Sequence, residues 1–262
     1  MSPIKPTPKQ PLTASNTVVE LKRASKWYRR GEEKTVVLDE VDFRVQAGEC
    51  VFLLGPSGSG KTTLLSLIGC VLSADAGDVR VLGHNPRQLD AQQLALLRRD
   101  HIGFVFQRFH LIRGLSALEN VAVPLLLRGY SHAQANRAAR EKLDVVGLGS
   151  YHATSPTRMS VGQCQRVAFA RALVGDPQLI LADEPTASLD GDTGQRAMEL
   201  LRAVTAEASK TVVVVTHDHR ILPFADRIVQ MQRGTLVDAQ PAPTVPVVLP
   251  ATFSQPVSLA AE

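Results

Sequence analysis

Long apolar runs are missing from the sequence. The longest are Leu64–Leu72, Val121–Leu127 and Val212–Val215, and each is far shorter than the roughly 18 residues that a membrane-spanning helix needs. The first ten residues, MSPIKPTPKQ, also lack the apolar core of a secretory signal. We therefore expect a chain with neither a transmembrane helix nor a signal peptide.

Cysteine and surplus charge are scarce as well. Cys50, Cys70 and Cys164 are far apart, odd in number and without the spacing of metal ligands. They are typical of reduced thiols in the core of a cytoplasmic protein. The 29 Lys and Arg residues nearly balance 25 Asp and Glu, giving a net charge of +4, and the basic residues are scattered. This balance predicts no nucleic-acid partner, and it is compatible with work beside an anionic membrane surface.

Proline is concentrated at the two ends of the chain. Residues 1–16 and 239–262 are rich in it, and proline at this density opposes helices and sheets. We predict a disordered lead at 1–16 and a flexible tail at 239–262. The body between them, 17–238, contains no internal repeat and no second copy of any motif, so we expect one large domain there.

Within the body, short apolar runs alternate with segments of helical periodicity. The runs predict strands at 18–21, at 36–38 together with 41–45, and at 51–54, 78–82, 102–106, 179–182, 211–215 and 228–231. The periodic segments predict helices near 60–69, 90–99, 163–174 and 193–206. This alternation predicts an α/β fold with a parallel sheet and helices on both faces. From about 108 to 165 only helical patterns occur, at 118–127 and 133–146, which predicts an inserted helical subdomain.

A glycine-rich run follows the apolar strand at 51–54. Gly55-Pro56-Ser57-Gly58-Ser59-Gly60-Lys61-Thr62 matches the pattern G-x-x-x-x-G-K-[ST] at the point where a helix begins. The glycines allow successive N–H groups to point at an anion, and the helix dipole favours negative charge. We predict that residues 55–63 bind a nucleotide. Lys61 would reach its β- and γ-phosphates, Thr62 would hold Mg²⁺ and Thr63 would lie on the α-phosphate side.

Two adjacent carboxylates end the apolar strand at 179–182. Asp183 and Glu184 therefore stand at the carboxyl edge of the sheet, where open α/β sheets bind ligands. Alone, such a pair is usually a solvated turn. Together with a complete phosphate loop, it predicts that Asp183 supports Mg²⁺ and that Glu184 orients or deprotonates the attacking water.

Further short motifs follow one another along residues 18–238. They are Tyr28, Gln107, Met159-Ser160-Val161-Gly162-Gln163, Ser188-Leu189-Asp190 and His217. In this order they resemble the adenine-stacking aromatic, the Q-loop glutamine, the signature Leu-Ser-Gly-Gly-Gln, the D-loop and the switch histidine of the ATP-binding cassette (ABC) ATPases. Outside this context, Gln107 and His217 would be ordinary solvated residues, and His217 with His219 is a poor metal site. A core-filling role is the alternative for Tyr28.

The resemblance implies a fold, an activity and partners. The fold is that of a P-loop NTPase with a parallel sheet core, an antiparallel β subdomain and an inserted helical subdomain at about 108–165. The activity is hydrolysis of ATP to ADP and phosphate, with ATP and Mg²⁺ as cofactors. Gln107, Glu184 and His217 would be catalytic, and Gln107 would also join Thr62 and Asp183 at Mg²⁺. Two cassettes bury ATP head to tail in this family, so a second copy would complete each site with its Ser160, Gly162, Gln163 and Asp190.

One position departs from the family pattern. Val161 stands where glycine is usual, and a β-branched residue disfavours positive φ. We predict a negative φ at Val161 and phosphate contacts from Ser160 and Gly162. Methionine in place of leucine at Met159 preserves the side-chain volume.

Three short stretches of the sequence resemble one group within the family. Gly55–Gly69, Leu118–Leu126 and Thr216–Leu222 look like the ATPases of macrolide exporters, lipoprotein-release systems and heterocyst glycolipid exporters. This implies a peripheral protein on the cytoplasmic face of the inner membrane, whose partners are a membrane permease and, in many such systems, a periplasmic adaptor. The family's groove for a permease helix would include Phe109, Leu111, Ile112 and Leu115.

Three other functions stay open. A soluble ABC ATPase acting on nucleic acid or ribosomes is opposed by the lack of a coiled-coil insertion, a tandem cassette and a basic stripe. A nucleotide-binding regulator without turnover is opposed by the presence of Gln107, Glu184 and His217. An ABC importer ATPase is compatible with every residue named above.

Overall fold

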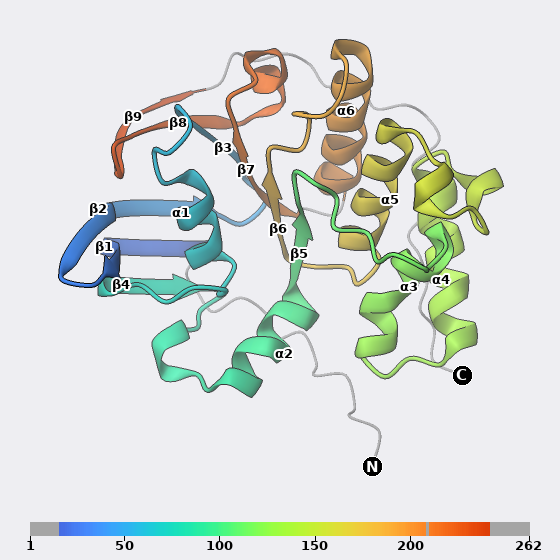
Figure 1. Ribbon diagram of the computed structural model, residues 1–262, viewed down its shortest axis with the longest axis horizontal. Helices are drawn as coiled ribbons and strands as arrows, with labels where there is room; N and C mark the ends of the chain where they lie inside the picture. The colour runs from blue at the N-terminus through green and yellow to red at the C-terminus, as the bar shows by residue number, and fades with distance from the viewer. Residues whose placement is uncertain (1–15, 208–209, 242–262) are drawn as a thin grey trace.

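The computed structural model describes residues 16–207 and 210–241 (Figure 1). The predicted lead, apart from Asn16, and the predicted tail beyond residue 241 lie outside the described residues.

The larger sheet has six strands in the order β5-β6-β7-β3-β8-β9. Their bounds are β3 Cys50–Leu54, β5 Ile102–Val105, β6 Leu179–Asp183, β7 Thr211–Thr216, β8 Arg227–Gln232 and β9 Thr235–Pro241. The first five strands in this order are parallel, and β9 is antiparallel to β8. Every residue of β3 and β7 is buried, because both faces of the sheet are covered. The predicted α/β fold is confirmed.

The central strand β3 sends alternate side chains into two cores. Leu53 shares one core with Leu64 of α1, whereas Phe52 shares the other with Phe169 of α5. The period of two in a strand therefore separates α1 from α5 on opposite faces of the sheet. The helices packed around the sheet are α1 Lys61–Ile68, α2 Ala91–His101, α5 Val161–Leu173 and α6 Gly191–Glu207. The 3₁₀ turns are η1 Pro86–Gln88, η2 Gly149–Tyr151, η3 Pro156–Arg158 and η4 His219–Phe224.

The smaller sheet is antiparallel, in the order β2-β1-β4. Its strands are β1 Thr17–Arg30, β2 Glu33–Gln46 and β4 Ala76–Val81. Its buried residues share the core that contains α1. The predicted strands are correctly placed but too short: β2 contains both 36–38 and 41–45, as predicted, and extends beyond them, and β1 runs on beyond Leu21. Pairing of Tyr28 with Thr35 extends both strands through residues without apolar alternation, because the ladder satisfies their backbone groups.

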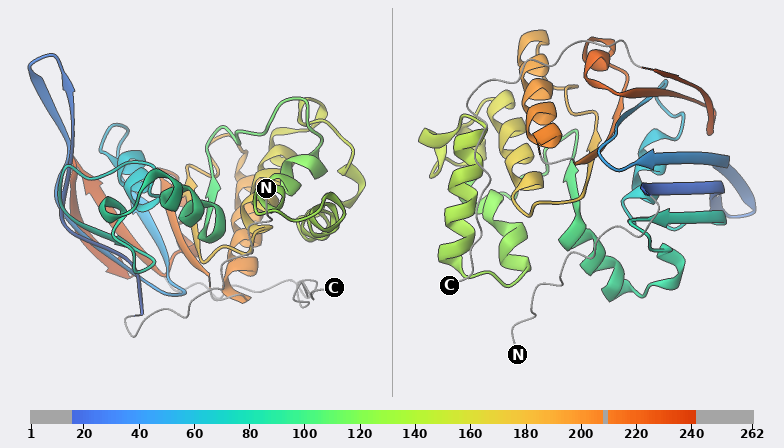
Figure 2. Two further views of the ribbon diagram at one scale, coloured as in Figure 1. Left: turned by 90° about the horizontal axis from the view of Figure 1, so that it is seen from below. Right: turned by 180° about the vertical axis from the view of Figure 1, so that it is seen from behind.

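Helices α3 (Ala117–Leu127) and α4 (His132–Val145) form the predicted helical subdomain with α5. A capping box of Ser116 and Glu119 begins α3. The subdomain lies at the opposite end of the molecule from the antiparallel sheet (Figure 2). Val167 of α5 enters this helical core, whereas Phe169 enters the sheet core. Helix α5 therefore joins the subdomain to the sheet.

Strand β9 corrects the predicted end of the domain. The sequence predicts a boundary after residue 238, but β9 pairs with β8 as far as Pro241, opposite Arg227. Proline is tolerated there because β9 is an edge strand, which leaves outward N–H groups unpaired. Residues 239–241 therefore belong to the sheet and not to the tail.

The helices and the cysteines can be followed in the part of the chain that the structure describes. No helix there is both long and apolar enough to cross a membrane. Cys50, Cys70 and Cys164 are buried, unbridged thiols, as predicted. Burial raises the pKa of Cys50 to about 12 and that of Cys70 to about 11, so both thiols are unreactive at neutral pH.

Candidate active site

Loops that follow β3, β5, β6 and β7 meet at the carboxyl edge of the larger sheet. They border a cavity of about 530 Å³, a size typical of small-molecule sites. Its walls carry Val37, Pro56, Ser57, Gly58, Gly60, Lys61, Thr62, Thr63, Gln107, Asp183, Glu184 and His217. The structure thus brings the phosphate loop, both predicted carboxylates, the Q-loop glutamine and the switch histidine together.

The phosphate loop, residues 55–62, needs glycine for steric reasons. Gly58 and Gly60 have φ values of 80° and 104°, which side chains disfavour. A Cβ at Gly60 would lie 2.8 Å from the carbonyl oxygen of Val37, and one at Gly55 would lie 2.3 Å from that of Met231. Ser59, which is 4% exposed, belongs to the base of the loop. The first turn of α1 carries no acidic residue to compete for its N–H groups.

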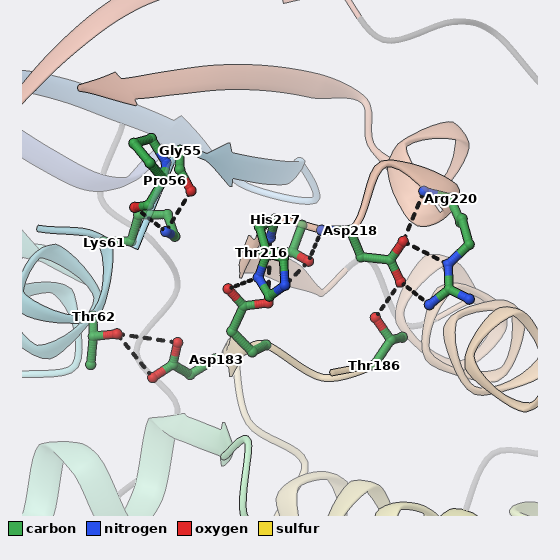
Figure 3. A network of polar contacts seen from close by, with 11 residues as sticks. Gly55, Pro56, Lys61, Thr62, Asp183, Thr186, Thr216, His217, Asp218 and Arg220 are labelled. Carbon is green, nitrogen blue, oxygen red and sulfur yellow. Dashed lines mark hydrogen bonds and ion pairs between the residues drawn. The ribbon is translucent and has the colours of Figure 1, made fainter. Parts of the chain in front are cut away.

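Lys61 places a buried cation beside the cavity. Only 7% of the residue is exposed, and its Nζ donates to the carbonyl oxygens of Gly55 at 2.7 Å and Pro56 at 2.9 Å (Figure 3). These carbonyl groups accept from two of its three N–H donors without neutralising its charge, and a buried ammonium group is stabilised by an anionic partner. A phosphate group in the cavity would supply that partner.

Thr62 and Asp183 point toward one another in the same cavity (Figure 3). Thr62 Oγ1 donates to Asp183 Oδ2 at 3.2 Å. Burial raises the pKa of the Asp183 carboxyl, so a neighbouring cation would favour its ionised form. This hydroxyl and carboxylate fit Mg²⁺, with phosphate oxygens and water as its other ligands. In residues 16–207 and 210–241, no group of three or more His, Cys, Asp and Glu side chains is placed to hold a metal.

Glu184 forms a pair with His217. Its Oε1 lies 2.8 Å from His217 Nδ1, and its Oε2 accepts from the His217 N–H and the Thr216 hydroxyl, both at 3.3 Å. Glu184 has a φ of 48°, an unusual backbone conformation for a residue with a side chain. Its side chain is 12% exposed, whereas that of His217 is 67% exposed. The pair therefore offers a carboxylate near the sheet edge and an imidazole toward solvent.

The signature segment lies outside this cavity, at the start of α5. Ser160 is the N-cap: its hydroxyl accepts from the Gln163 N–H at 3.2 Å, and Gln163 Oε1 accepts from the Ser160 N–H at 2.8 Å. A Cβ at Gly162 would lie 2.6 Å from Thr193 Cγ2, so this glycine is needed. Val161 is helical and 48% exposed. Its φ is not positive, as predicted.

Asp190 and Tyr28 lie outside the cavity wall as well. Asp190 caps α6 by accepting from the N–H and hydroxyl of Thr193, both at 2.9 Å. Tyr28 is 47% exposed on β1, with Lys26 Nζ 5.7 Å from its ring centre. A part in nucleotide binding for Ser160, Gly162, Gln163 and Asp190 therefore requires a second molecule.

Sequence reasoning missed two sets of supporting contacts. Arg171 of α5 donates to the carbonyl oxygens of Phe109 and His110, just after Gln107. Asp218 accepts from the hydroxyl of Thr186 at 3.0 Å. His110 and Arg171 are 61 residues apart, and Thr186 and Asp218 are 32 apart, so no local pattern signals either contact.

Comparison with known proteins decides the family. Residues 38–187 match the sequence profile of the ABC transporter family. The chain belongs to that family. An uncharacterised ABC transporter ATP-binding protein of Mycobacterium tuberculosis is 42% identical over 244 residues, which cover 90% of this chain and 98% of that protein. The probable export ATP-binding/permease protein MacB of Pseudomonas entomophila is 41% identical over 221 residues, which cover 84% of this chain and 33% of that protein.

A solved structure extends the comparison to the fold. It is a dimeric, post-hydrolysis state of an ATP-binding cassette of Methanocaldococcus jannaschii, bound to ADP and Pi. The two chains are similar with a TM-score of 0.80 and 42% identity, covering 85% of this chain and 98% of that one. The predicted ABC ATPase fold is therefore confirmed, and family membership supports ATP binding and hydrolysis by this ABC cassette.

Proposed function

We propose that this chain is the ATP-hydrolysing subunit of a membrane transporter, and that two copies bury two ATP molecules between them. The observation that carries the proposal is the division of the machinery within one chain. The phosphate loop and the Glu184–His217 pair share one cavity, whereas Ser160 and Gly162 lie at the start of α5, outside its wall. A head-to-tail pair of chains would bring each signature segment to the other chain's nucleotide. The dimeric relative bound to ADP and Pi supports this arrangement.

The residues of the cavity have separate tasks in this proposal. Lys61 and the N–H groups of the loop bind the β- and γ-phosphates. Thr62, Asp183 and Gln107 hold Mg²⁺, which neutralises developing charge on the phosphates when it is bound. Glu184 orients or deprotonates the attacking water. The exposed imidazole of His217 contacts the γ-phosphate and stabilises charge in the transition state.

Tyr28 is assigned to the adenine ring. Its partner in the β1–β2 ladder, Thr35, is two residues from Val37, which lines the cavity. Tyr28 is therefore paired with a residue that lies two positions before the cavity wall. The face of its exposed phenol ring is suited to stacking on a base. Ser160, Gly162, Gln163 and Asp190 are assigned to the nucleotide of the second copy.

Export is the proposed direction of transport. The relatives named export ATP-binding/permease proteins combine both activities in their names, and this chain spans about a third of their length. A separate permease, with a periplasmic adaptor, would then complete the transporter at the cytoplasmic face of the inner membrane. The loop after Gln107 would receive the permease, since Ile112 is 43% exposed there. The alternatives are an ABC importer ATPase and a soluble ABC ATPase that acts on nucleic acid or ribosomes.

The proposal is tested with Glu184→Gln, which keeps the size of the side chain and removes its charge. We expect this variant to bind ATP and Mg²⁺, to lose turnover and to elute as a dimer in size-exclusion chromatography. Glu49→Gln is the control, since Glu49 pairs with Arg227 and is no part of the cavity wall. Glu184→Gln turning over ATP at the wild-type rate would refute the catalytic role, and a monomer at saturating ATP would refute the sandwich.

The permease assignment has its own test. Glu184→Gln should retain an export permease during purification from membranes, and Ile112→Asp should release it while ATP binding persists. Survival of the complex in Ile112→Asp would place the docking surface elsewhere. Recovery with ribosomes, nucleic acid or an import permease would favour the corresponding alternative.

A further inference from the structure

Asp218 is the centre of a polar network with Thr186 and Arg220, next to His217 (Figure 3). Its carboxylate accepts from the Thr186 hydroxyl at 3.0 Å, from the Arg220 N–H at 3.0 Å, and from Arg220 Nε and Nη2, both at 2.8 Å. The side chain is 12% exposed. Arg220, as the strongest influence, holds the pKa of Asp218 at about 2, so the carboxylate is ionised at any pH at which the protein works.

The network joins the two loops that carry the pair. Thr186 is fully buried and lies two residues after Glu184, while Asp218 directly follows His217. A second connection runs through Thr216: its hydroxyl accepts from the Asp218 N–H at 2.9 Å and donates to Glu184 at 3.3 Å. Two hydrogen-bonded routes therefore link Asp218 to the segment that begins at Glu184.

The backbone conformation of Glu184 depends on surrounding contacts. Its left-handed φ of 48° persists only where surrounding contacts hold it. Its N–H donates to the Val215 carbonyl oxygen at 2.8 Å, which fixes its position relative to β7. The hydrogen bond from Thr186 to Asp218 fixes the chain on the other side of Glu184.

Arg220 extends the network to the start of α6. A Cβ on Gly191 would lie 3.1 Å from Arg220 Nη1, and the charge of Asp190 acts on the guanidinium. Arg220 thus contacts Asp218, which directly follows the switch histidine His217, and it also approaches the D-loop, residues 188–190. Its side chain is 58% exposed, so it lies on the surface of the protein.

We propose that Asp218 and Arg220 are positioning residues for ATP hydrolysis. They hold Glu184 in register with His217 and fix the D-loop relative to this pair. The inference rests on the proposed function, because Glu184, His217 and the D-loop take their roles from it. The wall of the nucleotide cavity is formed by other residues. Loss of the network should therefore disturb the chemical step and leave the grip on ATP intact.

The test compares steady-state ATP hydrolysis by the full chain and its Asp218→Asn variant. Asparagine keeps the size and one acceptor oxygen but loses the ionic attraction to Arg220. We expect kcat to fall about tenfold, because small displacements of catalytic groups are costly. The KM for ATP should stay within about twofold of the wild-type value, since the contacts that bind ATP equally in the ground state and the transition state are unchanged. An unchanged kcat, or a loss confined to KM, would overturn the inference.

Arg220→Gln and Arg220→Lys separate positioning from folding. Arg220 is largely exposed, so both variants keep the fold even if Asp218→Asn does not. We expect Arg220→Gln to lower kcat and Arg220→Lys to restore part of it, because lysine keeps the charge but forms a single bond. Equal kcat values in the wild type and both variants would refute a role for Arg220.

Glu49→Gln is the matched control for the loss of a carboxylate. Glu49 accepts from Arg227 Nε at 2.6 Å, and its side chain is 17% exposed. It precedes β3, at the end of the sheet away from the nucleotide cavity. The kcat of Glu49→Gln should match that of the wild type. An equal fall of kcat in Glu49→Gln and Asp218→Asn would mean that losing either carboxylate destabilises the protein in general, and it would overturn the inference. A wild type without ATP hydrolysis would instead refute the proposed function itself.

Discussion

Arg171 donates a hydrogen bond to the carbonyl oxygen of His110 at 2.6 Å. A second bond, also 2.6 Å, reaches the carbonyl oxygen of Phe109. Both acceptor residues have left-handed φ values, 58° for Phe109 and 45° for His110. The helix that begins at the signature segment therefore holds the strained loop that follows Gln107.

Replacing Arg171 with leucine should loosen this loop. The carbonyl oxygens of half-buried Phe109 and exposed His110 lose their donor, and a typical hydrogen bond contributes about 0.5–1.5 kcal/mol to stability. We expect the free energy of unfolding to fall by about that amount and the amides of residues 108–115 to exchange faster with solvent. Denaturant titration and hydrogen–deuterium exchange measure the two effects.

Arg166→Leu is the control on the same helix. Arg166 Nη1 also donates to backbone carbonyl oxygens, those of Val146 at 3.2 Å and Gly147 at 3.4 Å, but these residues directly follow α4. We expect Arg166→Leu to lower stability without faster exchange at 108–115. Equal exchange at 108–115 in both variants would show that Arg171 has no special hold on the loop.

The contrast between the phosphate loop and Arg171 explains how much could be predicted from the sequence. Residues 55–62 are contiguous, and the positive φ values of Gly58 and Gly60 are local demands, so the spacing of these residues predicts the course of the loop. The close approach of Gly55 to Met231 depends on tertiary packing. The buried strands are equally local, because their apolar runs follow from burial on both faces. The bond from Arg171 to His110 depends on how two distant segments pack, and no spacing encodes it. The same holds for Asp218 and Thr186.

Strand lengths were predictable only where apolar patterns continue. Strand β1 runs to Arg30 and β9 to Pro241, although neither end alternates between apolar and polar residues. Their partner strands impose these ends, since Arg29 pairs with Lys34 and Pro241 with Arg227. The sequence predicts a helix start at the signature segment, which is observed at α5, but the distance of this segment from the cavity depends on the tertiary packing of α5.

Val161→Gly should change ATP hydrolysis by less than about tenfold. Val161 occupies the first turn of α5 with a helical backbone and 48% of its surface exposed, so glycine relieves no clash and removes a conformational restriction worth about 1 kcal/mol. Steady-state kcat for ATP measures the effect. A rise of more than tenfold would mean that valine restrains turnover at this position.

Gly162→Ala is the sharper change in the same segment. Its new Cβ would lie 2.6 Å from Thr193 Cγ2, closer than carbon atoms approach, so the Thr193 side chain must leave its hydrogen bond to Asp190 or α5 and α6 must move apart. Overpacking of this kind costs about 1–3 kcal/mol, and we expect a lower melting temperature and weaker ATP-induced dimerisation than in Val161→Gly. Equal melting temperatures in the two variants would contradict the steric argument.

Arg220→Gln should make stability less dependent on acid pH. The hydrogen bonds from Arg220 lower the pKa of Asp218 from 3.8 to about 2 in the folded chain. A lowered folded pKa stabilises the protein above the unfolded value, and this stability is lost as pH falls from about 4 toward 2. The melting temperature of Arg220→Gln should therefore lie below that of the wild type at pH 6, and the difference should shrink toward pH 3. A constant difference would indicate that Arg220 stabilises through packing alone.

Asp183→Asn should raise stability while it lowers activity. Burial, the largest influence, raises the pKa of Asp183 in the folded chain, so ionising this carboxyl at neutral pH destabilises the fold. Asparagine removes the charge and keeps an acceptor for the Thr62 hydroxyl. We expect a higher melting temperature without nucleotide at pH 7, and a gain that disappears as acid protonates the carboxyl in both states, near and below a pH of about 4.

The same substitution should weaken the response to Mg²⁺. An amide oxygen carries no net charge, so Asp183→Asn should need a higher Mg²⁺ concentration for half-maximal ATP hydrolysis, by about tenfold or more. A titration of Mg²⁺ at saturating ATP measures this shift, and Glu49→Gln serves as the control, because Glu49 pairs with Arg227 and is no part of the cavity wall. A higher melting temperature together with a higher Mg²⁺ requirement in Asp183→Asn would show that the Asp183 carboxylate serves function and lowers stability. A lower melting temperature with an unchanged Mg²⁺ requirement would instead make Asp183 a structural partner of Thr62.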